Sequence, residues 1–130
     1  MYVYYNPNPR HKKSIGDCSV RALAKALNTS WESAYIDLIT IGYNIGDMPS
    51  SNATIAKLLH EKGFRKAIIP NDCPACYSVL DFSEKNPKGK FILGTGSHLV
   101  TVVDGKYYDT WDSGDEIPIC VWFKNEAPNF

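Results

Sequence analysis

A cysteine stands where an amphipathic helix should begin. In the stretch GDCSVRALAKAL, apolar residues follow the spacing of one helical face from Val20 to Leu27. Cys18 opens that helix directly after Asp17, whose carboxylate we expect to cap the first turn. The unpaired N–H groups and the dipole of a helix N-terminus favour a thiolate, which attacks carbonyl carbon. The same N–H groups can stabilise an oxyanion, so Cys18 is a candidate nucleophile.

A base for this nucleophile is expected from His98, in the stretch GTGSHLVTVV. The pair Asp104-Gly105 between two β-like runs predicts a hairpin with a two-residue turn. That register places Trp111 opposite His98 and Asp109 diagonal to it on the same face of the sheet. A carboxylate there would orient the imidazole and support its charged form.

A longer turn is the alternative, and it would change the third residue of the site. A shift of one residue would place Asp112 opposite His98. We favour Asp109 because Asp-Gly strongly prefers the tighter turn. Each of these residues alone has an ordinary structural role, but Cys18, His98 and Asp109 together match one catalytic mechanism. Trp111 is expected to shield the bond between aspartate and histidine from water.

Together, GDCSVRALAKAL and GSHLVTVVDGKYYDTWD resemble the papain-like cysteine peptidase superfamily. The likeness is greatest to its small bacterial branch, the double-glycine-leader (bacteriocin-processing) peptidases. Their pattern is an Asp-Cys pair opening a helix, then His on a strand, then Asp or Asn on the next strand. The resemblance implies a papain-like fold and a Cys18, His98 and Asp109 triad that cleaves a peptide or isopeptide amide. It implies no metal and no organic cofactor.

The chain departs from that pattern just before the cysteine. Members usually carry a glutamine there, whose amide completes the oxyanion hole, and this sequence contains no glutamine. Lys12, Asn8 or Asn6 would have to take its place. Ser19 also stands where the leader peptidases tend to have glycine.

Three further helices are expected between Cys18 and the β-like runs. The stretch TSWE has capping-box spacing and predicts a helix that ends at Gly42. A third helix is expected over 52–62, and a fourth opens at Ser78 and closes before Pro87. The residues expected to be buried on the second and third helices are Trp31, Tyr35, Leu38, Ile39, Ile55, Leu58 and Leu59.

Short runs rich in β-branched and aromatic residues follow the helices. These are KFILGT, SHLVTVV, KYYDTW and IPICVWF, and KAIIP at 66–70 is a candidate edge strand. Residues 1–13 are expected to be irregular, because Pro7 and Pro9 prevent regular pairing. The predicted fold is α+β, with N-terminal helices packed on one side of a C-terminal antiparallel sheet.

Length and composition fit one globular domain over 1–130. With 130 residues, 44% hydrophobic and 22% charged, we expect a helical part at about 14–86 and a sheet part at about 90–124. Lys and Arg number 14, as do Asp and Glu, so the charge invites neither nucleic acid nor an anionic membrane. The apolar runs are too short to span a bilayer and no secretion signal is visible, so a cytoplasmic location is expected. The expected partner is a peptide or protein substrate.

The remaining cysteines offer competing chemistry. Cys73 and Cys76 have the spacing of a zinc half-site or a redox pair, but no second such pair completes four ligands. We favour a loop with two incidental thiols, and we interpret Cys120 as a packing residue. Alternatives to the hydrolase are an acyltransferase with the same residues, a catalytically inactive papain-like binding module, and a zinc-stabilised interaction domain.

Overall fold

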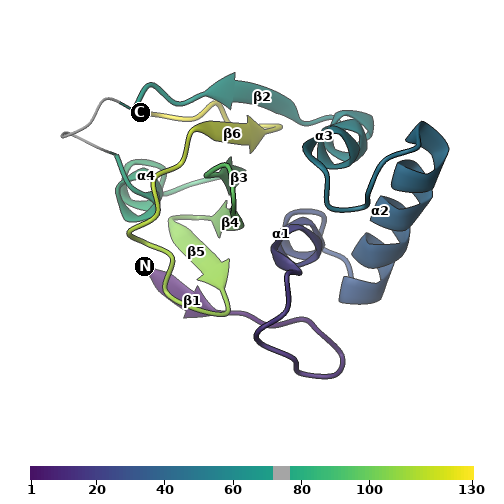
Figure 1. Cartoon of the computed structure of the whole chain (residues 1–130). Coiled ribbons are helices and arrows are strands. Elements are labelled where there is room, and N and C mark those ends of the chain that lie inside the picture. The colour runs from purple at the N-terminus through teal and green to yellow at the C-terminus, as the bar shows by residue number, and fades with distance from the viewer. Residues whose placement is uncertain (72–76) are drawn as a thin grey trace.

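The computed structural model describes residues 1–71 and 77–130, which form four helices and one six-stranded sheet (Figure 1). The helices are α1 (Cys18–Ala26), α2 (Trp31–Ile45), α3 (Asn52–Glu61) and α4 (Val79–Lys85). The strands are β1 (Tyr2–Tyr4), β2 (Arg65–Ile68), β3 (Lys90–Gly94), β4 (Leu99–Val103), β5 (Lys106–Asp109) and β6 (Cys120–Phe123). Their order in the sheet is β1-β5-β4-β3-β6-β2, and the α+β class predicted from the sequence is confirmed.

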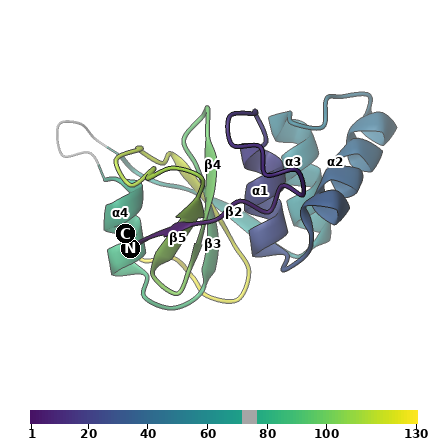
Figure 2. The ribbon, with the colours of Figure 1, turned by 90° about the horizontal axis from the view of Figure 1, so that it is seen from below.

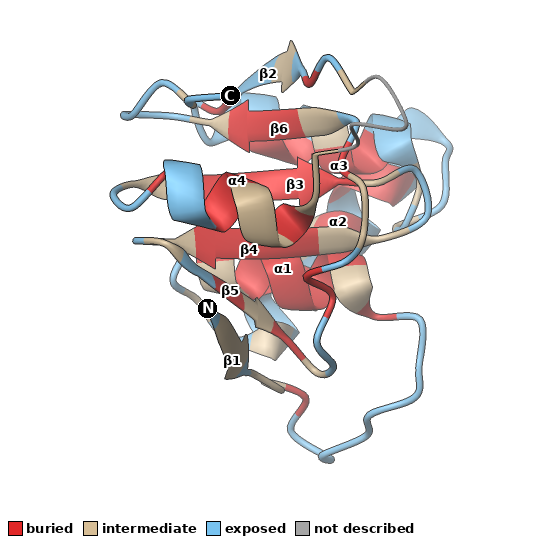
Figure 3. Ribbon diagram, turned by 90° about the vertical axis from the view of Figure 1, so that its left-hand side faces the viewer, coloured by how far each residue is buried: buried red, intermediate tan, exposed pale blue. Residues whose placement is uncertain are grey.

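Helices cover both faces of the sheet, so the prediction of helices on one side alone is wrong (Figure 2). On β3, Ile92 packs with α1, α2 and α3, whereas Phe91 and Leu93 pack with α4 on the opposite face. The central strands are buried on both faces, as the red strands of Figure 3 show. Burial on both faces explains why these strands are mostly apolar rather than alternating with polar residues, with Thr101 of β4 as a buried, hydrogen-bonded exception.

The N-terminal strand β1 was not predicted, because residues 1–13 were expected to be irregular. β1 pairs in parallel with β5, in the register Tyr2 opposite Tyr107 and Tyr4 opposite Asp109. The prolines at 7 and 9 come after the paired residues and do not interfere with the ladder. The sheet is therefore mixed rather than antiparallel throughout, with the N-terminal segment on one edge.

Helix α2 differs from the prediction in its end and in its buried face. It continues to Ile45 and ends at Gly46, a left-handed C-cap with φ 73°. Its buried residues are Ala34, Leu38, Ile41 and Gly42. Tyr35 and Ile39 are exposed and Trp31 is half-buried, contrary to expectation. Small residues decide the face, because a Cβ at Gly42 would lie 2.8 Å from the carbonyl oxygen of Asp47.

The other predicted elements agree with the structure. Helix α3 buries Ile55, Leu58 and Leu59, and α4 begins with a capping box formed by Ser78 and Asp81. Strand β2 lies at the sheet edge, as expected for KAIIP. In the described ranges 1–71 and 77–130, no helix combines the length and apolar character that a membrane crossing needs.

The hairpin between β4 and β5 has the predicted tight turn. Val103 lies opposite Lys106, which leaves Asp104 and Gly105 as the turn residues. Both have positive φ, 49° and 76°, as this type of turn requires. Helix α1 is anchored to the same hairpin, since the hydroxyl of Thr101 on β4 donates to the carbonyl oxygen of Ala22 at 2.6 Å. This contact fixes the helix that carries Cys18 against the strand that follows His98.

Candidate active site

Cys18 is the first residue of α1 and lines a cleft of about 370 Å³. His98 lines the same cleft, together with Gly16 and Ser19 from the start of α1. The expected cap by Asp17 is wrong, because its side chain makes no capping hydrogen bond. The first turn of α1, which carries the Cys18 thiol, therefore has no carboxylate cap from Asp17.

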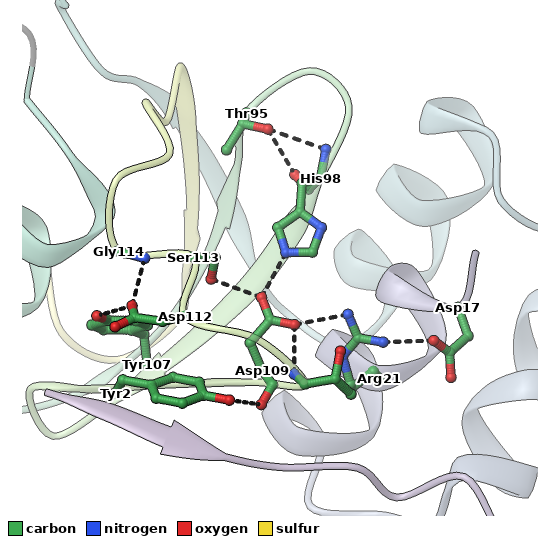
Figure 4. Close-up of polar contacts among 11 residues, drawn as sticks. Tyr2, Asp17, Arg21, Thr95, His98, Tyr107, Asp109, Asp112, Ser113 and Gly114 are labelled. Carbon is green, nitrogen blue, oxygen red and sulfur yellow. Dashed lines mark hydrogen bonds and ion pairs between the residues drawn. The ribbon is translucent and has the colours of Figure 1, made fainter. Parts of the chain in front are cut away.

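His98 lies one residue before β4 rather than within the strand, and the turn that holds it is hydrogen-bonded. Its backbone N–H donates to the hydroxyl oxygen of Thr95 at 3.1 Å, and the N–H of Thr95 donates to the carbonyl of His98 at 2.9 Å. The imidazole Nε2 lies 2.6 Å from Oδ2 of Asp109 (Figure 4). The ring of Trp111 packs against the imidazole with centroids 5.1 Å apart, and 46% of Trp111 remains exposed. The structure thus brings Asp109 to His98, at the place given by the predicted register.

Asp109 is fully buried and its oxygens accept hydrogen bonds from several elements. Besides His98, Oδ2 accepts from the hydroxyl of Ser113 at 2.7 Å. Oδ1 accepts from Arg21 Nη2 at 2.8 Å and from the N–H of Thr110 at 2.8 Å. Burial acts to raise the pKa of Asp109, but the hydrogen bonds from His98 and Ser113 and the positive charges nearby lower it overall. The carboxylate is therefore ionised and fixed in orientation.

The ionisation of Cys18 and His98 is coupled across the cleft. Burial acts to raise the pKa of Cys18, but hydrogen bonds from His98 and from the backbone of Leu99 outweigh it, and the pKa is lowered. The positive charges of His98 and Arg21 act in the same direction. Burial acts to lower the pKa of His98, whereas hydrogen bonding to Asp109 and Cys18 raises it to about 9. Each residue thus favours the charged form of the other, a thiolate on Cys18 and an imidazolium on His98.

Arg21 is a residue of this site that the sequence analysis missed. It is buried, and its guanidinium bridges Asp109 and Asp17, with Nη1 2.5 Å from Oδ1 of Asp17. Asp17 also accepts from the indole N–H of Trp31 at 3.0 Å. The signal was present, because an arginine four residues after an aspartate, within an otherwise apolar helix, fits a buried ion pair.

The alternative residues considered for the site lie elsewhere. Asp112 accepts from the hydroxyl of Tyr107 at 2.5 Å and from the N–H of Gly114 at 3.0 Å, rather than from His98. Asn8 is buried and accepts from the backbone N–H of Arg10, and Lys12 is exposed. Among the described residues, neither Asn8 nor Lys12 lines the cleft that holds Cys18, and the same is true of Asn6. The structure does not bring the proposed substitutes for glutamine to the thiol.

Cys120 lines the cleft as well, which its expected packing role did not indicate. It is half-buried at the start of β6, and its sulfur lies 3.9 Å from the carbonyl oxygen of Gly94. Cys73 and Cys76, which have the zinc or redox spacing, lie outside the described residues. Over residues 1–71 and 77–130, His, Cys, Asp and Glu side chains form no group of three or more that could hold a metal ion.

Comparisons of this chain with models of protein families, with curated proteins and with solved structures gave no match.

Proposed function

We propose that the protein is a cysteine-dependent hydrolase that cleaves a peptide or isopeptide amide, with Cys18 as nucleophile, His98 as acid and base, and Asp109 as orienting carboxylate. The observation that carries the proposal is the chain of contacts from Asp109, 2.6 Å from the imidazole of His98, to Cys18 in the same cleft. The lowered pKa of Cys18 and the raised pKa of His98 match the needs of such a mechanism.

The reaction would proceed in two steps. The Cys18 thiolate attacks the amide carbonyl, and the imidazolium of His98 protonates the leaving amine as the C–N bond breaks, which leaves a thioester. Neutral His98 then takes a proton from water, and the hydroxide attacks the thioester to release the acid and the thiolate. Asp109 keeps the imidazole in the productive orientation throughout both steps.

Oxyanion stabilisation would come from the first turn of α1 rather than from a glutamine. The carboxylate of Asp17 is engaged by Arg21 and Trp31 instead of capping the helix. The backbone N–H of Cys18 is therefore free of competition from Asp17 and can donate to the oxyanion. Gly16, Cys18 and Ser19 line the cleft at this turn of the chain.

A papain-like fold is part of this proposal. The order of the parts supports it, with the cysteine opening a helix, the histidine entering a central strand, and the aspartate ending the next strand. Helix α1 packs against β4 through the contact of Thr101 with Ala22, which sets the helix N-terminus beside the histidine.

The thiol chemistry can be tested without knowing the substrate. We expect iodoacetamide to alkylate Cys18 near neutral pH much faster than the other thiols, and His98→Ala to slow that alkylation at least tenfold, because the imidazolium stabilises the thiolate. Mass spectrometry of peptides from the labelled protein gives the rate at each cysteine. Cys120→Ala is the matched control, since it removes the other described thiol of the cleft and should leave the Cys18 rate unchanged.

Hydrolysis itself needs a second measurement. Incubation with a peptide library and mass spectrometry should reveal new termini that are absent with Cys18→Ala, while the melting temperature of that variant stays close to that of the unaltered protein. Equal, slow alkylation of all thiols together with no cleavage would contradict the proposal and favour a binding module.

A further inference from the structure

The wall of the cleft carries an unbalanced positive charge. Cys18 and His98 both line it, and each shifts the pKa of the other toward its charged form, a thiolate and an imidazolium of opposite charge. The remaining charged side chain among the described residues that line it is Lys66, and no aspartate or glutamate is among them. A substrate that enters the cleft therefore meets one uncompensated cation in the same cleft as the thiol.

Lys66 is held on the face of the sheet where the cleft lies. Strand β2 lies at the sheet edge beside β6 (Figure 1). Lys66 on β2 stands directly opposite Trp122 on β6, and opposite residues of paired strands share a face. Trp122 is buried and packs with the core of α1, α2 and α3, and its ring forms a T-shaped pair with the His60 ring, with centroids 5.3 Å apart. The ammonium of Lys66 lies over the indole, 5.7 Å from its centroid, within the range of a cation–π contact.

The charge of Lys66 is available to a ligand. Its side chain is exposed. Within residues 1–71 and 77–130, no carboxylate forms an ion pair with Lys66 at 4.0 Å or less. Lys57 on α3 differs, because it is paired with Glu61 at 3.5 Å and does not line the cleft. A cation that lies over a buried aromatic ring and lacks such a carboxylate partner suits recognition of an anion.

We propose that Lys66 selects substrates with a carboxylate close to the scissile amide, so that the protein acts on acidic peptide segments. This inference rests on the proposed hydrolase for its reaction, but the recognition of the carboxylate by Lys66 is a separate property. The carboxylate can be the side chain of Asp or Glu, or the terminal carboxylate of a peptide, and both present the same chemistry to the ammonium.

Matched peptides test the selection directly. Pairs that differ by Glu against Gln at one position near the cleavage site, with both termini blocked, are compared as competing substrates, and a further pair carries a free or an amidated C-terminus. We expect the acidic member to be cleaved with a kcat/KM about fivefold higher, because a partly enclosed ion pair contributes modestly to affinity. The preference should shrink at about 1 M salt, where the Debye length is about 3 Å.

Two variants assign that preference to Lys66. Lys66→Ala should abolish it while cleavage of the Gln peptide continues, and Lys66→Glu should reverse it. Lys57→Ala is the control, which should keep the full preference. Preference for the Glu peptides identifies side-chain recognition, and preference for the free C-terminus identifies terminal recognition. An equal rate on both members of every pair, or a preference that survives Lys66→Ala, overturns the inference.

A binding measurement separates this inference from the proposed function. Fluorescence anisotropy with Cys18→Ala protein and labelled Glu and Gln peptides reports affinity without turnover. Lys66-dependent binding of acidic peptides together with absent hydrolysis would support the recognition site and contradict the hydrolase. Hydrolysis that requires Cys18 but ignores peptide charge would support the hydrolase and contradict the role of Lys66.

Discussion

The protonation states of Cys18 and His98 are the residue-scale property on which the proposed chemistry depends. The thiol needs a lowered pKa and the imidazole a raised one, and each residue shifts the pKa of the other in the required direction. Asp109 contributes to the same balance from the far side of the imidazole, 2.6 Å away. Side chains from three separated parts of the sequence therefore influence one another's ionisation.

A pH profile should report this coupling. We expect kcat/KM on a peptide substrate to rise as Cys18 ionises, at a pH below the ordinary thiol range, and to fall as His98 loses its proton at about pH 9. The sign follows because His98 must be protonated to donate to the leaving amine. Asp109→Asn should move the basic limb to lower pH, since Asp109 raises the pKa of His98.

The control for that profile is a check that the variant remains folded. Circular dichroism across the same pH range must show Asp109→Asn folded wherever its activity is compared. A basic limb that stays at the same pH in Asp109→Asn would contradict the role given to the carboxylate.

At the scale of elements, helix α1 contributes more than the nucleophile. Asp17 precedes the helix and Arg21 lies one turn into it, and Arg21 joins Asp17 to Asp109 of β5. The helix and the strand are thus connected by a buried charge network in addition to the contact of Thr101 with Ala22. Removing a single partner from such a network leaves an uncompensated charge without water.

Substitution of Arg21 should therefore lower the free energy of unfolding more than substitution of Asp17 does. We expect Arg21→Met to lower the free energy of unfolding by about 3–5 kcal/mol, because two buried carboxylates lose their shared cation. Asp17→Asn keeps the ion pair of Arg21 with Asp109 and should cost less, about 1–2 kcal/mol. Urea denaturation of both variants measures the difference. A cost for Arg21→Met below that for Asp17→Asn would show that the network does not stabilise the junction.

The elements differ in how far their sequence determines them. The Asp104-Gly105 turn is local, since both residues must accept positive φ, and it fixed the register that placed Asp109 beside His98. The buried face of helix α2 was harder to predict, because Ile36, Ile39 and Ile41 form more than one apolar face and tertiary packing selects the buried one. Strand β1 depends on a pairing with β5, distant in the sequence, and the short run YVY carries no local signal for it.

The candidate site also combines residues that local sequence predicts with residues that it does not. The helix start and the hairpin predicted Cys18, His98 and Asp109 from local patterns, and the structure brings His98 and Asp109 into contact. The roles of Asp17 and Arg21 depend on Asp109, which lies 88 residues from Arg21 in the sequence. The contribution of Cys120 and Lys66 to the cleft depends on how β6 pairs with β3 and how edge strand β2 pairs with β6, which no local pattern reveals.

At the scale of the whole molecule, the sheet separates two apolar cores. One core joins α1, α2 and α3 to Ile92 and Trp122, on the face that carries the cleft. The other joins α4 to Phe91 and Leu93 on the opposite face. Stability and the proposed chemistry are thus supported from different sides of the sheet, with α4 away from the thiol.

This separation predicts that damage to the α4 core lowers stability without altering the thiol. Phe82 is fully buried in α4 and packs edge-on against Phe91 with ring centroids 5.2 Å apart. Phe82→Leu should cost about 1–2 kcal/mol, because a smaller side chain leaves part of that space unfilled. Below its melting temperature, this variant should still alkylate Cys18 within about twofold of the unaltered rate, since the sheet holds α1 and His98 in place.

Leu23→Ala provides the comparison on the other face, because Leu23 is fully buried in α1 beside the cleft-side core. We expect Leu23→Ala to lower the free energy of unfolding by about 2–5 kcal/mol. It should also slow alkylation of Cys18, since a cavity beneath α1 loosens the helix that presents Cys18. Thermal melting and the alkylation rate measured on the same samples distinguish the two effects. If Phe82→Leu slowed alkylation as much as Leu23→Ala at equal loss of stability, the sheet would transmit the disturbance and the two faces would not be independent.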